Sequence, residues 1–227
     1  GASTVTASQI NLKGESGQMA KASITDGSVL SAGIGGLFVA AGNSEVPDYA
    51  TLNIDGGVVN SVSGTYIGAE KGTGFVNINN GGKLNSFGVI GTSGGQGFVS
   101  VKGEGSEWNA GAIEMATDSS SSGVLTVGDG GRVTAEHINV GPGPGSIRIT
   151  GDVPGVLDVK NINLGSQSYI FMEHGSDNYD FRTDISGSGQ LALASGTTNF
   201  YGQNTYSGPT FIGGYDNDVI FRAQNEN

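Results

Sequence analysis

Apolar and polar residues alternate along most of the chain with a period of two, in short runs that end at glycine. The run from Leu52 to Ile54 is typical, because two apolar side chains flank the polar Asn53. A period of two places alternate side chains on opposite faces of a strand and does not fit a helix. The pattern therefore predicts an all-β protein of short strands, each with one buried and one solvated face.

These alternating runs recur at a spacing of about 23–25 residues. The first strand of each unit begins at the apolar anchors Leu52, Val76, Val99, Leu125 and Ile147. The last strand of each unit carries a second series of anchors, at Ile67, Ile90, Met115, Val140 and Leu164. A unit that holds three short strands and their turns has the length of one coil of a parallel β-helix, in which coils stack roughly 4.8 Å apart.

The aligned units also place like residues in columns between the two anchor series. The middle strand is expected to point inward at Val59, Leu84, Trp108, Val133 and Leu157. Trp108 is therefore expected in the core, and sugar stacking from an exposed position is the alternative. The outward positions of the first strand are small and mostly uncharged, at Asn53, Asn77, Ser100, Thr126 and Arg148. Such a column suits a flat, hydrated sheet surface.

The sequence thus predicts a right-handed parallel β-helix of about nine coils, spanning residues 1–227 as a single segment. Residues 1–49 form irregular first coils, residues 50–167 form regular repeats, and residues 168–227 form acidic and aromatic coils.

In the irregular part, Ile10–Leu12 resembles the last strand of a unit and Ala22–Ile24 resembles the first strand. The longer spacing to the next unit, about 30 residues, predicts an enlarged corner loop near Asn43–Tyr49.

Composition agrees with many tight turns and narrows the function. Glycine accounts for 42 of 227 residues, and glycine readily supplies the positive φ that turns require. The chain has no cysteine, which excludes cysteine-based zinc sites and thiol chemistry. The formal net charge of −11 disfavours nucleic acid and anionic lipid as partners. No run of about 20 apolar residues and no signal peptide is visible, and we expect the chain to be a piece of a longer protein.

Two motifs carry a family resemblance. Gly103, Gly105, Ser106 and Trp108, followed by the run from Gly123 to Gly131, resemble the G-x-G-S-x-W repeat of type V secreted passengers. Residues 185–214 are similar to the autotransporter-associated β-strand repeat. Its N-T-Y-x-G-x-T core is matched by Asn204, Thr205, Tyr206, Gly208 and Thr210. Together the motifs cover about residues 50–214.

The resemblance implies the passenger domain of a Gram-negative autotransporter, exported to the cell surface and anchored in the outer membrane through a barrel that this chain lacks. Such passengers act as adhesins in virulence, autoaggregation and biofilm growth. The implied partners are a host-surface glycan or matrix protein, or the same protein on a neighbouring cell, with no nucleic acid and no membrane insertion by this segment. Two alternatives stay open: a passive β-helical stalk that presents a functional head elsewhere, and a glycan-active β-helix enzyme.

An enzyme of the second kind needs charged groups from successive coils that converge on one sheet. The outward positions beside the asparagine column are Asp55, Asn79, Lys102, Gly128 and Thr150, so no three carboxylates share a column. His137 and His174 lie about one and a half coils apart, on different faces, and are expected to be solvated corner residues. The sequence therefore predicts no catalytic site, no metal site and no cofactor.

Acidic and aromatic residues gather in the last third of the chain. The candidate ligand-binding residues are Asp177, Tyr179, Asp180, Tyr215, Asp216 and Asp218. Carboxylates beside exposed tyrosines suit glycan or protein recognition, whereas irregular final coils explain the same residues without a ligand. The spacing matches neither the nonapeptide calcium repeat nor an EF-hand loop. A further polar segment, Asp118–Ser122, is expected to form a protruding, flexible, solvated loop.

Overall fold

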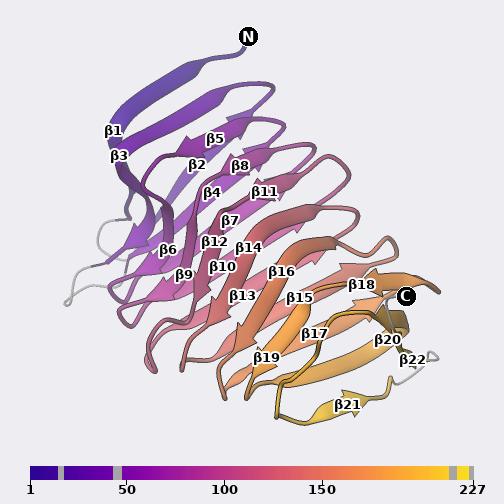
Figure 1. Cartoon of the computed structure of the whole chain (residues 1–227). Coiled ribbons are helices and arrows are strands. Elements are labelled where there is room, and N and C mark those ends of the chain that lie inside the picture. The colour runs from indigo at the N-terminus through magenta and orange to yellow at the C-terminus, as the bar shows by residue number, and fades with distance from the viewer. Residues whose placement is uncertain (15–17, 43–47, 215–218, 225–227) are drawn as a thin grey trace.

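The computed structural model describes residues 1–14, 18–42, 48–214 and 219–224 of the chain. Within these residues all regular elements are strands, which stack in about nine turns as a parallel β-helix. Figure 1 shows the coils as successive layers that run from the N-terminus to the C-terminus along one axis. The predicted fold class is confirmed.

One wall of the solenoid contains the first strand of each coil and belongs to an 11-stranded sheet, named sheet 1 here. Its 11 strands are β2 (Met19–Thr25), β4 (Tyr49–Asp55), β7 (Thr73–Asn79), β10 (Gln96–Lys102), β13 (Ser122–Gly128), β15 (Gly145–Gly151), β17 (Ser168–His174), β18 (Tyr179–Phe181), β20 (Gln190–Phe200), β21 (Thr210–Ile212) and β22 (Val219–Ala223). From β2 to β20 each first strand pairs in parallel with its counterpart in the next coil. Strand β20 continues sheet 1 around the corner to β18 and β22.

The other two walls form a second 11-stranded sheet, named sheet 2. It consists of β1 (Thr4–Leu12), β3 (Val29–Ala41), β5 (Val58–Ser61), β6 (Thr65–Ala69), β8 (Lys83–Asn85), β9 (Gly88–Thr92), β11 (Glu107–Asn109), β12 (Ala112–Met115), β14 (Arg132–Val140), β16 (Val156–Leu164) and β19 (Asp184–Gly187). The two walls belong to one sheet because the long strands β3 and β14 each span both of them. One part of β3 pairs with β5 and the other with β6.

The strand register confirms the predicted columns. The first anchors pair in the order Leu52, Val76, Val99, Leu125 and Ile147. The second series pairs likewise from Ile67 to Leu164, and both series are buried. The stacked side chains merge into one continuous hydrophobic core, which a single coil could not form alone.

The first coils follow the same register despite their longer spacing. Ala22 pairs with Leu52, as the resemblance between the two runs predicts. Leu12 pairs with Val39, which in turn pairs with Ile67. The last-strand column therefore extends to the first strand of the chain. Residues 43–47 of the expected corner loop lie outside the described residues.

Trp108 occupies the core, as predicted, and is fully buried between Leu84 and Val133. Its indole Nε1 donates a hydrogen bond of 2.9 Å to the backbone carbonyl of Ser86. The ring lies against Gly88, where a Cβ atom would come within 2.1 Å of Cζ2. The large ring thus fits a slender coil because the neighbouring coil lacks a side chain at this point.

No helix in the described part of the chain is long and apolar enough to cross a membrane.

Candidate functional site

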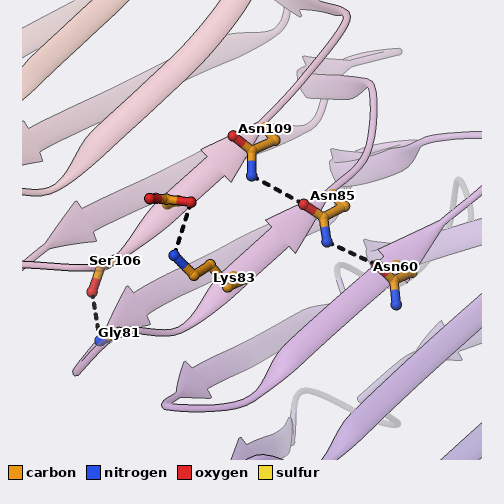
Figure 2. Close-up of polar contacts among 7 residues, drawn as sticks. Asn60, Gly81, Lys83, Asn85, Ser106 and Asn109 are labelled. Atoms are coloured by element: carbon orange, nitrogen blue, oxygen red, sulfur yellow. Dashed lines mark hydrogen bonds and ion pairs between the residues drawn. The ribbon is translucent and has the colours of Figure 1, made fainter.

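Three asparagines form a ladder on the outer surface of β5, β8 and β11. Asn85 Nδ2 donates to Asn60 Oδ1 at 2.9 Å, and Asn109 Nδ2 donates to Asn85 Oδ1 at 3.1 Å (Figure 2). Parallel in-register stacking repeats one position in each coil, so each amide can donate to one neighbour and accept from the other. Asn85 and Asn109 are exposed, and the ladder therefore offers its remaining amide atoms to solvent.

A column of alternating charge runs beside this ladder. Lys83 Nζ lies 2.8 Å from Glu107 Oε2, and Glu107 pairs across the strands with Arg132 as well. The hydrogen bond from Lys83 holds the pKa of the Glu107 carboxyl below its usual range. Arg132 reaches Asp158 at 3.1 Å. We name the surface formed by Asn60, Asn85, Asn109 and the charged residues Lys83, Glu107, Arg132 and Asp158 the amide face. Figure 2 shows its three asparagines and Lys83.

The amide face carries balanced charge within a strongly acidic chain. Its two cations and two anions cancel, whereas the whole chain has a formal net charge of −11. Each ion pair is partly solvated, so it contributes roughly 0–1 kcal/mol to stability. This surface was not among the predicted sites, although asparagine recurs at one position of the middle strand in three successive units.

Sheet 1 has a second, shorter amide contact on its outer surface. Asn77 Nδ2 donates to Asn53 Oδ1 at 2.9 Å, in the predicted outward column. Beside it, the rings of Phe75 and Phe98 stack with centroids 5.0 Å apart. In the register of this sheet, Asp55 pairs with Asn79. The described residues contain no group of three or more His, Cys, Asp or Glu that could hold a metal ion.

A groove of about 910 Å³ opens where β15, β17 and β20 reach the corner of the solenoid. We name it the C-terminal groove. Its polar lining includes Asp152, Glu173 and Asp177, and its apolar lining includes Phe171. The Arg148 guanidinium lies 5.2 Å from the centroid of the Phe171 ring, a cation–π contact worth roughly 0.5–1 kcal/mol at exposed sites.

The structure separates the candidate ligand-binding residues. Asp177 is exposed and lines the C-terminal groove. Asp180 lies outside the groove lining, accepts a hydrogen bond of 3.0 Å from Asn199 Nδ2, and pairs with Arg182. The Asn199 hydrogen bond holds the pKa of the Asp180 carboxyl below its usual range. Tyr215, Asp216 and Asp218 lie outside the described residues.

Tyr179 is buried, so the expectation of an exposed tyrosine at this position is wrong. Its hydroxyl donates to the Gly155 carbonyl at 3.0 Å, and burial raises the pKa of the phenol. The reason is strand alternation within β18, which turns Tyr179 and Phe181 inward and Asp180 outward.

The prediction for His174 is also wrong. His174 is 2% exposed and not a solvated corner residue, because alternation in β17 places it on the inward side with Ile170 and Met172. Nε2 lies 3.0 Å from Thr198 Oγ1, and desolvation lowers the pKa of the imidazole. His137 is partly exposed, with Nε2 at 3.7 Å from Glu114 Oε1.

The residues of the G-x-G-S-x-W motif build a corner. Gly103 and Gly105 have φ values of 88° and 78°, in the left-handed region that favours glycine. Ser106 is fully buried, and its hydroxyl accepts a hydrogen bond of 3.1 Å from the Gly81 amide of the previous coil (Figure 2). With Trp108 in the core, the motif positions one coil on the next.

The matched residues of the N-T-Y-x-G-x-T core also connect coils. Asn204 Oδ1 accepts from the Ile185 amide at 3.2 Å, and the Thr205 amide donates to the Ile185 carbonyl at 2.8 Å. A Cβ on Gly208 would lie 2.0 Å from the Gly189 carbonyl oxygen. These contacts hold the last turn against β19, and none of the matched residues lines the C-terminal groove.

The Asp118–Ser122 segment is polar, as expected, but it is held in place. Asp118 accepts hydrogen bonds from the hydroxyls of Ser120 and Ser121 and from the backbone amide of Ser93 in the previous coil. These bonds lower the pKa of the Asp118 carboxyl, with the Ser120 hydroxyl as the largest cause. Ser121 is fully buried. Ser119 and Ser120 are exposed, as expected for a solvated loop, whereas Asp118 ties two coils together.

Comparison with known proteins places few limits on function. Models of known protein families give no match, and no solved structure matches. The chain is similar to the uncharacterized protein YuaQ of Escherichia coli (strain K12), with 29% identity over 155 residues. That alignment covers 64% of this chain and 11% of the relative, so the chain spans a small part of the length of the protein it matches.

Proposed function

We propose that this chain is a self-association segment of a surface-exposed autotransporter passenger, and that the amide face is its contact surface. In this proposal the segment promotes aggregation between cells that display it, rather than catalysing a reaction. The location at the bacterial surface rests on the two sequence motifs. The amide ladder is the single observation that carries the proposed contact.

An exposed amide column is self-complementary. Each Asn side chain presents both donors and an acceptor, so the same surface on a second copy can satisfy it when the two run in opposite directions. A two-fold contact of this kind uses one patch twice and needs no separate receptor surface. Asn85 and Asn109 are exposed and lie on adjacent strands, where a partner amide can reach both.

Charge favours the same surface. Two copies of a chain with net charge −11 repel one another over most of their area. The charges of the amide face, Lys83, Glu107 and Arg132 along one column and Asp158 beside Arg132, cancel one another, so this face does not add to that repulsion. This face therefore offers a contact in which repulsion between copies is reduced.

The test compares one substitution in two amide contacts on different walls. Asn85→Asp places a charge in the amide face, and Asn77→Asp makes the same change in the Asn53–Asn77 contact of sheet 1. A like charge at a two-fold contact meets its own copy, so Asn85→Asp should weaken association at least about tenfold. Asn77→Asp should leave association unchanged. Sedimentation of the purified chain and clumping of beads coated with it measure the effect.

Circular dichroism of both variants checks that the solenoid is intact. The proposal fails if the unaltered chain stays monomeric at high concentration and its beads do not clump. It fails equally if Asn85→Asp and Asn77→Asp weaken clumping to the same extent, because the effect would then be general charge repulsion. Either result favours the alternative of a passive stalk that presents a functional head elsewhere.

A further inference from the structure

We infer that the C-terminal groove is a binding site for an uncharged oligosaccharide. The groove lies on a different wall from the amide face, so this inference stands apart from the proposed self-association. It rests on the shape of the groove, its aromatic and acidic lining, and buried polar atoms at its surface that have no partner within the described residues.

The groove provides room for a ligand because much of its lining is backbone. Gly151, Gly175, Gly196, Gly213 and Gly214 all contribute to it. Its volume of about 910 Å³ is in the range of small-molecule sites, which span roughly 300–1,000 Å³. A groove of this size accommodates a short chain of sugar rings.

Phe171 supplies an apolar surface that a sugar ring can cover. It occupies an outward position of β17 and is partly exposed, and Arg148 of the preceding coil lies over its ring. The aromatic ring is therefore oriented before any ligand arrives. An apolar platform beside a few fixed polar groups is the usual composition of a small-molecule site.

The acidic groups decide the charge of the ligand. Asp152, Glu173 and Asp177 line the groove and are exposed, and they outnumber Arg148, whose guanidinium is held over the Phe171 ring. Carboxylates accept hydrogen bonds from sugar hydroxyls, and they repel uronic acids, sialic acids and sulfated sugars. The lining therefore selects a neutral glycan over an acidic one.

Among the described residues, two buried atoms at the groove lack a hydrogen-bond partner. They are Thr150 Oγ1 and His174 Nδ1. His174 Nε2 lies 3.0 Å from Thr198 Oγ1, so Nδ1 is the ring nitrogen that has no partner among the described residues. A Cβ on Gly196 would lie 2.4 Å from Nδ1, so the glycine leaves open the space beside this atom. A buried polar atom without a partner costs free energy, which a ligand hydroxyl, able to donate or to accept, would recover.

The experiment presents the purified chain to three sets of immobilised oligosaccharides. The neutral set contains oligomers of glucose, galactose, mannose and N-acetylglucosamine. The acidic set contains oligogalacturonate and sialyllactose, and the amino-sugar set contains chitosan oligomers. We expect saturable binding within the neutral set and no binding to the acidic set. Any stronger binding of chitosan should disappear when salt is added, because it would come from charge attraction.

Variants then locate the binding. Phe171→Ala removes the platform and should weaken binding of the best neutral oligosaccharide at least about tenfold. Glu173→Gln should weaken it too, and it tests the groove if Phe171→Ala folds poorly. Phe98→Ala, which alters the stacked pair elsewhere on sheet 1, should bind normally.

Three results would overturn the inference. The first is that no neutral oligosaccharide binds, and the second is that binding occurs only to chitosan and is abolished by salt. The third is that Phe98→Ala and Phe171→Ala bind equally well while Glu173→Gln is unaffected. Asn85→Asp separates this site from the proposed self-association. It should clump poorly and still bind the oligosaccharide, whereas Phe171→Ala should show the opposite behaviour.

Discussion

At the scale of single residues, Gly88 allows the core to hold Trp108. The glycine and the indole belong to neighbouring coils, and a methyl group on Gly88 would lie 2.1 Å from the ring carbon Cζ2. Interiors pack at high density, so the ring cannot retreat without displacing other side chains. The pair shows how a large residue in one repeat constrains the choice of residue in the next.

Gly88→Ala should therefore destabilise the protein by about 1–3 kcal/mol, the usual cost of overpacking. Gly111→Ala is the matched control, because a Cβ there meets nothing within 4 Å and its φ is not positive. Urea unfolding, followed by circular dichroism and by fluorescence of the single tryptophan, measures both. Equal unfolding midpoints for the two variants would contradict the packing argument.

His174 makes stability depend on pH. Its imidazole is buried, and desolvation lowers its pKa from the ordinary value of 6.5. Below pH 6.5 the unfolded chain therefore binds a proton that the folded chain does not, so this contribution to stability is complete above pH 6.5 and is lost as the pH falls toward the folded pKa. The slope from one such group is at most about 1.4 kcal/mol per pH unit.

His174→Asn should remove this part of the pH dependence. Between about pH 7.5 and 5.5 the free energy of unfolding should fall less for this variant than for the unaltered chain, even if its stability at neutral pH is lower. His137→Asn, at the partly exposed histidine, is the control. If both variants showed the same pH profile as the unaltered chain, the buried imidazole would not be the source.

At the scale of the element, strand alternation was informative even where the predictions were wrong. β17 alternates inward and outward along its length, and this pattern places His174 with Ile170 and Met172. The short strand β18 turns Tyr179 inward by the same rule. The exposure of both residues was predicted from the chemistry of their side chains. The period of two was the better guide, because backbone pairing fixes the orientation of each side chain.

A local irregularity helps to form the C-terminal groove. The register between β17 and β20 shifts between Met172 and Glu173, so that Glu173 pairs with Ser195. A bulge of this kind adds a residue to one strand and bends it. The groove lies beside this shift, where the outer surface of sheet 1 departs from the flat stacking seen in the regular coils. No periodic pattern in the sequence predicts it.

At the scale of the whole molecule, each coil contacts its neighbours through one repeated register. Gly123 and Gly145 occupy the same position in consecutive coils, as do Val133 and Leu157. Contacts in a solenoid are made mainly between adjacent repeats, so removing one complete repeat leaves its neighbours able to pair.

Deletion of residues 123–144 should therefore give a shorter folded solenoid. The deletion joins Ser122 to Gly145, which takes the place of Gly123, and Leu157 then follows Trp108 in the core column. Circular dichroism should retain its β signal, with moderately lower stability because one set of interfaces is lost. Deletion of residues 123–133 is the control and should not fold, because the later strands would lose their register with the preceding coil. Similar behaviour of both deletions would contradict this view.

The sequence alone predicted the strands, the parallel register and the core columns from Leu52 to Ile147. It could do so because a solenoid repeats local information. Strand alternation and coil length both depend on residues that are close in the chain. The positions of Trp108 and of the outward Asn53 and Asn77 follow from the same two periods.

The places where polar side chains gather follow from the three-dimensional packing of the coils and could not be predicted from the sequence. The amide face joins residues about one coil apart, and the C-terminal groove combines β15, β17 and β20 with the later residues Gly213 and Gly214. The desolvation of His174 likewise depends on the packing of Tyr179 and Thr198 around it. These features depend on how the coils are offset and bent against one another. Packing between coils fixes that offset, and the sequence of a single repeat does not encode it.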